Sequence, residues 1–180
     1  MKNTTLLIET VLSNRHNNGL MSKWINGATN EYNQGSDRTI TNYLFGVSPH
    51  DPNYRSEKAI AWFIMGTTAR LLREGMICEH CNFGTSIARL VKSAKFSEST
   101  ITMTINRIKT SSSVVDILSN IGYIVGLCIN ANVKVDIKKL AYELRDFSKR
   151  DCRIETIDGW EYSYYNYDMI ENLKNKEQNV

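Results

Sequence analysis

The sequence predicts an all-α fold, a helical bundle of two packed helical halves, on three grounds. Apolar residues recur at the three- and four-residue spacing of helices in most segments. Only 2 prolines occur in 180 residues, so few segments are barred from helix formation. Hydrophobic residues make up 42% and charged residues 23% of the chain, which is ordinary for a globular protein with a core.

The length indicates a single domain. A chain of 180 residues can bury roughly two-thirds or more of its unfolded surface in one domain or in two halves that share a core. We expect one helical domain over residues 1–180. Its N-terminal half should cover about residues 1–110 and its C-terminal half about residues 111–172.

The N-terminal region begins with a predicted helix and continues into loop-like sequence. Leu7, Val11 and Leu12 recur at helical spacing within the first 15 residues. Residues 17–52 are instead dense in Asn, Gly, Ser and Asp. Gly35, Ser36 and Asp37 indicate a loop before a short apolar run from about Tyr43 to Val47, and we expect mobility in this region, whose conformation the sequence leaves open.

Three helices are predicted in the centre of the chain. Ser56 suits the N-cap of a helix that ends near Gly75, a short helix follows from Gly84 to about Ser93, and Ser97 opens the third. The apolar stripes of the first and third are Ile60, Phe63, Ile64, Thr67 and Leu71, then Ile101, Ile105 and Ile108. We expect both stripes to face the core.

The next two helices have the clearest start signals. Ser113 and Asp116 form a capping-box-like start, and the helix that they open should be the most buried one and end near Asn132. Asp136 should cap a further helix that continues to about Lys149. Their apolar stripes are Val114, Leu118, Ile121, Val125 and Cys128, then Ile137, Leu140, Leu144 and Phe147.

The segment after Arg153 allows two interpretations. Asp158 and Gly159 between partly alternating runs are typical of a β-hairpin turn. The spacing of Ile154, Ile157, Trp160 and Tyr164 also suits one face of a helix. An isolated hairpin in a helical chain would need something to pack against, so we favour the helix.

Nothing in the sequence indicates export. The N-terminal apolar run is too short for a signal peptide, and we expect no segment to approach the roughly 18 apolar residues of a membrane span. We therefore predict a cytoplasmic protein, with no membrane partner and its 4 cysteines reduced.

No cofactor, metal or catalytic site is predicted. Cys78 and Cys81 have the spacing of half a zinc site, but no second pair follows at a usable interval. The 3 histidines lie in loop-like sequence, the carboxylates are scattered, and no phosphate-binding glycine loop occurs. We therefore expect a protein that is not an enzyme.

Positive charge is segregated along the chain rather than large in total. The formal charge of +3 is too small to indicate a nucleic-acid partner by itself. The segment from residue 89 to 109 nevertheless carries five cations against Glu98 alone. These candidate phosphate-binding residues are Arg89, Lys92, Lys95, Arg107 and Lys109.

A basic stripe with an aromatic residue inside it is predicted on the helix after Asp136. Lys138, Tyr142, Arg145 and Lys149 are separated by four, three and four residues, which keeps them within about 60° of one another on a helix. Such a stripe, with the adjacent Lys139, could follow a phosphate backbone. It could equally be an ordinary solvated face.

The segment IARLVKSAKFSESTITMTINRI looks at first like a helix-turn-helix. In that motif, glycine follows the first helix's Ala by four residues and the second helix's anchor lies about ten on. Here Lys92 follows Ala88, and the anchor Ile101 lies thirteen residues on. This connection is too long for the motif. A helix-turn-helix transcriptional regulator is therefore kept only as the alternative function, and a purely structural helical adaptor is a second alternative.

Several runs resemble the CasB family, the small subunit of the type I-E CRISPR surveillance complex Cascade. They are GTSIARLV, ESTITMTINRI, VVDILSNIGYIVGLCINANVKVD and the pattern formed by Asp136, Leu140 and Leu144 before Phe147. AIAWFIMGTTARLL resembles the apolar helix that precedes them in the family. The chain departs from the family in its Ser and Thr residues after Ser97, where relatives are often richer in Arg.

The resemblance implies a non-catalytic, all-helical subunit of antiviral defence, present in two copies. It would lie against the repeated backbone subunits and beside the large PAM-reading subunit. It would stabilise pairing between crRNA and target DNA and hold the displaced strand of the R-loop. The resemblance carries over Arg89 directly, and Arg107 and Lys109 as parts of a cationic helix.

Overall fold

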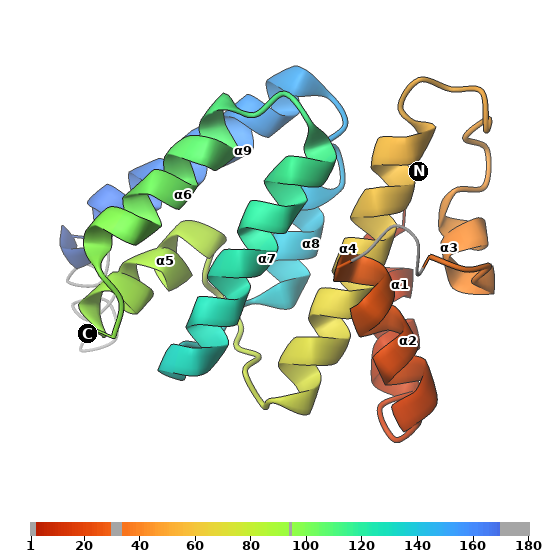
Figure 1. Cartoon of the computed structure of the whole chain (residues 1–180), viewed down its shortest axis with the longest axis horizontal. Coiled ribbons are helices and arrows are strands. Elements are labelled where there is room, and N and C mark those ends of the chain that lie inside the picture. Colours follow the sequence, from red (N-terminus) through yellow and green to blue (C-terminus); the bar gives the residue numbers. More distant parts are fainter. Residues whose placement is uncertain (1–2, 30–33, 94, 170–180) are drawn as a thin grey trace, which may run out of the picture.

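Helices form the regular structure of the protein, and the all-α prediction is confirmed (Figure 1). The computed structural model describes residues 3–29, 34–93 and 95–169. The helices are α1 (Thr4–Ser13), α2 (Asn18–Thr29), α3 (Arg38–Tyr43), α4 (Tyr54–Arg73), α5 (Phe83–Lys92), α6 (Glu98–Thr110), α7 (Val114–Ala131), α8 (Ile137–Leu144) and α9 (Arg150–Tyr165). Within the described residues the only extended pairing is an isolated parallel bridge between Ile77 and Val135.

Three of the four predicted N-caps are confirmed. The side chains of Ser97, Ser113 and Asp136 accept hydrogen bonds from backbone N–H groups in the first turns of α6, α7 and α8. The prediction for α4 was wrong, because α4 begins at Tyr54 and Ser56 lies inside its first turn. The α7 helix ends as expected, with Asn132 in the left-handed conformation at φ 58°.

Residues 17–52, whose conformation the sequence left open, hold two helices beside the loop predicted at residues 35–37. Residues 18–29 form α2 and residues 38–43 form α3. The α2 helix buries Met21 and Trp24, and a Cβ at its Gly27 would lie 2.3 Å from the ring of Trp62 on α4. This close packing accounts for a helix in a segment whose Gly and Asn content disfavours one.

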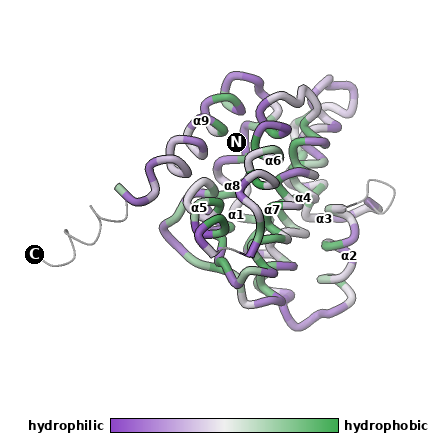
Figure 2. The backbone as a smooth tube through the Cα atoms, turned by 60° about the vertical axis from the view of Figure 1, so that its left-hand side comes forward, coloured by the Kyte–Doolittle hydropathy of each residue, from purple (hydrophilic) through white to green (hydrophobic). Residues whose placement is uncertain are grey.

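The core is centred on α4 and α7, where hydrophobic residues concentrate, while α9 is mostly hydrophilic (Figure 2). Trp62, Ile64 and Met65 in the middle of α4 have no solvent exposure. The predicted stripes of α4, α6 and α7 are all buried. The core therefore follows the helical periodicity read from the sequence.

Helix packing joins the described helices in two groups. Helices α1, α2 and α3 pack against α4, whereas α5 and α6 pack against α7 and α9. The two groups meet where α4 contacts α7 and α8.

The helix after Asp136 is shorter than predicted. It ends at Leu144, and residues 145–148 form turns before α9 begins at Arg150. Phe147 is fully buried in this turn, and Ser148 donates a hydrogen bond to the buried Glu57 on α4. These two tertiary contacts fix the turn where the sequence pattern alone continues a helix.

The preference for a helix over a hairpin near Gly159 is confirmed, since both Asp158 and Gly159 lie within α9. Ile157, Trp160 and Tyr164 are buried as predicted. Ile154 is not, with 46% of its surface exposed.

Helix α7 contradicts the expectation that no segment approaches the apolar length of a membrane span. By length and composition it is apolar enough to cross one, with a mean hydropathy of 1.6 over 18 residues. Half of that segment is buried inside the bundle, as in the core helix of a globular protein. The described residues therefore carry no clear transmembrane signal, and a cytoplasmic location stays a prediction.

Candidate nucleic-acid interface

Eight of the nine predicted phosphate-binding residues lie in three groups, and the ninth, Lys95, lies in the loop before α6. Arg89 and Lys92 lie on α5, facing the residues after α9. Arg107 and Lys109 lie in the last turn of α6, where Lys109 contacts α9. A third group surrounds α8, with Lys138 and Lys139 on the helix and Arg145 and Lys149 in the turn that follows.

The two α5 cations hold the segment that follows α9. The Arg89 Nε–H donates to the hydroxyl of Tyr167 over 3.2 Å, and Lys92 forms an ion pair with Asp168. Both cations also face the Tyr167 ring, with Lys92 Nζ 4.8 Å from its centroid. The Tyr167 ring packs partly buried against the core, so Arg89 and Lys92 have a structural role here.

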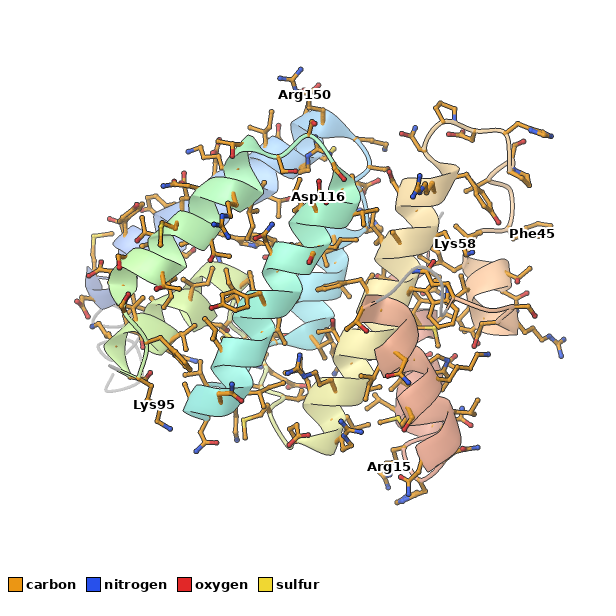
Figure 3. All side chains as sticks on the ribbon, viewed as in Figure 1. Arg15, Phe45, Lys58, Lys95, Asp116 and Arg150 are labelled. Carbon is orange, nitrogen blue, oxygen red and sulfur yellow. The ribbon has the colours of Figure 1, made fainter. Side chains whose placement is uncertain are left out.

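The α6 cations differ from each other. Lys109 Nζ lies 2.5 Å from Glu161 on α9, and this hydrogen bond raises the pKa of Lys109. Arg107 is exposed, and no hydrogen bond or ion pair joins its side chain to another described residue. Lys95, in the loop before α6, reaches the carbonyl of Asn130 at the end of α7 over 3.5 Å (Figure 3).

Carboxylates neutralise the cations at the start of α8. Lys138 Nζ lies 3.0 Å from Glu79, and this hydrogen bond lowers the pKa of Glu79 and raises that of Lys138. Lys139 Nζ lies 3.9 Å from the Oε1 atom of Glu143, which is one helical turn further along α8. Glu143 also accepts a hydrogen bond of 2.8 Å from the indole N–H of Trp160. Burial raises the pKa of Glu143 nevertheless.

Tyr142 presents an exposed ring between two cations. Its exposed fraction is 57%, the Arg145 guanidinium carbon lies 4.6 Å from the ring centroid, and Lys139 Nζ lies 5.8 Å from it. Both distances fall within the range of cation–π attraction. We call Lys139, Tyr142 and Arg145 the Tyr142 cluster.

Asp146 anchors the far side of this cluster. It pairs with Arg145 over 3.0 Å and with Lys149 over 3.2 Å. Burial alone would raise the pKa of Asp146, but hydrogen bonds from Arg145 and Lys149 outweigh burial and lower it. The anchored guanidinium is thereby held against the exposed ring.

The carboxylate partners of these cations can be exchanged for another anion. Most of the lysines involved have half or more of their side chain exposed. Exposed ion pairs of this kind contribute about 0–1 kcal/mol and weaken with salt. A phosphate group can therefore replace the carboxylate partner without a large loss of stability.

The structure adds two arginines that the sequence analysis missed. Arg55 and Arg153 line a polar hollow of about 520 Å³ between the start of α4, the start of α7 and the turn before α9. Ser56, Ser112 and Ser148 line it as well, together with Asp116. Arg55 and Arg153 are far apart in sequence, so no local pattern could have joined them.

The thiols of the closely spaced cysteine pair contact each other. Cys78 Sγ and Cys81 Sγ lie 3.1 Å apart, and burial raises the pKa of Cys78 to about 12. Among the described residues, no group of three or more His, Cys, Asp or Glu side chains is arranged to hold a metal ion.

The α5–α6 connection has the long form expected from the spacing of Ala88 and Ile101. Residues 93–97 separate the two helices, and both Ala88 and Ile101 are buried. The chain then continues into the core helix α7 rather than into a hairpin.

Most of the residues that carry the CasB resemblance have structural roles in this fold. A Cβ at Gly84 would lie 2.1 Å from the carbonyl oxygen of Trp160, so Gly84 permits close packing of α5 on α9. Asp136 caps α8, and Leu140, Leu144 and Phe147 are fully buried. Arg89 has a structural role too, since it donates a hydrogen bond to Tyr167.

Comparison with protein-family models, with curated proteins and with solved structures finds no match to this chain.

Proposed function

We propose that this chain is a non-catalytic nucleic-acid-binding subunit of the CasB type. The observation that carries the proposal is the Tyr142 cluster, in which a tyrosine with 57% of its surface exposed lies between Lys139 and Arg145. An exposed ring offers a stacking surface for a base or sugar, and the flanking cations are placed to meet the adjoining phosphates. Binding of this kind does not read sequence.

The proposed role fits a complex in which a guide RNA reads the target. Base pairing then supplies the specificity, while protein cations hold the heteroduplex and the displaced strand through their backbones. The proposed partners are crRNA, target and non-target DNA, the repeated backbone subunit, the large PAM-reading subunit and a second copy of the chain. The proposed location is the cytoplasm.

The Tyr142 ring gives a direct test with a matched control. We expect Tyr142→Ala to weaken binding of single-stranded DNA by about 1–3 kcal/mol, because one stacked base is lost. Tyr142→Phe should bind like the wild type. Tyr162 on α9, 59% exposed, supplies the control, and Tyr162→Ala should leave affinity unchanged.

Fluorescence anisotropy with a labelled oligonucleotide at low salt measures all four proteins. Equal losses for Tyr142→Ala and Tyr162→Ala would indicate general surface effects and contradict the proposal. A strong preference of the wild type for one duplex sequence would favour the helix-turn-helix regulator instead.

A further inference from the structure

A groove lies between α4 and α7, and at one end it adjoins the Arg55–Arg153 hollow, since Asp116 lines both. Helix α2 closes one side, and the cavity volume is about 430 Å³, which lies within the usual range for small-molecule sites. Its lining is mixed: Ile25, Phe63, Leu118 and Val125 supply apolar side chains, and Thr29, Gln34, Thr67 and Ser119 supply polar ones. Along α4 it extends about 16 Å, since eleven residues separate Ala59 from Arg70.

Missing side chains on α7 open this groove. Helices α4 and α7 run parallel, so that Gly122 faces Phe63 and Gly126 faces Arg70 (Figure 1). A Cβ at Gly122 would lie 3.4 Å from the Phe63 ring, which is an ordinary contact distance. A larger side chain at residue 122 would therefore extend into the groove without a clash at its Cβ.

Arg70 is the one cation among the described residues that line the groove. Arg70 lies in the last turn of α4, and its guanidinium crosses to α7, where a Cβ at Gly126 would lie 3.3 Å from it. No hydrogen bond or ion pair joins this guanidinium to another described residue. Asp116 lines the opposite end, about 15 Å away by the helical rise between residues 116 and 126 (Figure 3).

We infer that the groove binds a small amphipathic carboxylate. Its apolar body would lie on Phe63 and Leu118, and its carboxylate would accept hydrogen bonds from Arg70. The opening left by Gly126 leaves room for the guanidinium at one end of the groove, while the carboxylate of Asp116 at the other end is too distant to repel the ligand's charge. This inference does not depend on the proposed binding of nucleic acid.

Calorimetric titration with 6-phenylhexanoate and with its uncharged primary amide tests the inference on the full chain. We expect the wild type to bind the carboxylate about tenfold more tightly than the amide, because a hydrogen bond to a charged group is lost with the amide. Arg70→Gln should abolish this preference. The neighbouring Arg73 is 54% exposed and paired with Glu74, so Arg73→Gln should retain the preference.

A second variant tests the inference by filling the groove with a larger side chain. Gly122→Leu should abolish binding of both compounds while the thermal midpoint stays at or above that of the wild type, since Leu is a better helix former than Gly. Absence of binding to the wild type at millimolar ligand, equal affinity for carboxylate and amide, or an unchanged preference in Arg70→Gln would each overturn the inference. Arg70→Gln alters no core residue, so this arm stays decisive even where Gly122→Leu fails to fold.

Discussion

Two tyrosines in this protein face pairs of cations, and their surroundings differ. Tyr167 contacts Arg89 and Lys92, but its hydroxyl accepts a hydrogen bond from Arg89 and its ring packs against the core. Tyr142 contacts Lys139 and Arg145 while 57% of its surface stays exposed. The same residue types therefore hold two segments together in one place and leave the tyrosine mostly exposed beside its cations in the other.

The largest effect should come from the packing that supports the Tyr167 contacts. Gly84→Ala should destabilise the fold by about 3 kcal/mol, because its Cβ would lie 2.1 Å from the Trp160 carbonyl oxygen and force α5 from α9. Gly159→Ala, in the open on α9, should instead stabilise by about 1 kcal/mol. Urea unfolding measures both, and equal effects would refute the close α5–α9 contact.

Truncating Tyr167 should give the opposite pattern to truncating Tyr142. Tyr167→Ala should lower the free energy of unfolding by about 1–2 kcal/mol, because a partly buried ring and its hydrogen bond are lost. Its affinity for single-stranded DNA should match the wild type. Denaturant titration and anisotropy on the same preparation check this, and a loss of affinity with full stability would reverse the two assignments.

The smallest expected effect is on the pH dependence of stability. It comes from Glu143, which contacts both Lys139 of the Tyr142 cluster and Trp160. Burial raises its pKa in the folded protein, so the folded state binds a proton more tightly than the unfolded state. Stability should therefore fall as pH rises through the range just above the ordinary pKa of 4.5. Glu143→Gln should lack this contribution, as unfolding curves from about pH 4 to about pH 7 would show. Parallel pH profiles of stability for the wild type and Glu143→Gln would contradict this prediction.

Much of the fold could be predicted from local sequence, and the errors have physical causes. The caps Ser97, Ser113 and Asp136 act within three residues, so their hydrogen bonds were predictable. The end of α8 was not, because the hydrogen bond from Ser148 to Glu57 spans 91 residues. Helix α2 was missed because packing of Trp62 onto Gly27 overrides its poor propensity.

The candidate site was predictable in its cations but not in their partners. The spacing of Tyr142 and Arg145 brought the ring and the guanidinium together as expected, since the turn after α8 keeps them adjacent. Lys138 and Lys109 were predicted as free cations, yet their carboxylate partners lie 59 and 52 residues away in sequence. Such pairing depends on tertiary packing.

The salt dependence of binding tests the proposed phosphate contacts of the Tyr142 cluster most directly. Each contact with a single strand contributes about 0.7 to the slope of log affinity against log salt. We expect the double variant Lys139→Ala with Arg145→Ala to flatten the slope for single-stranded DNA by about 1.4. A variant with a slope equal to that of the wild type would contradict the account.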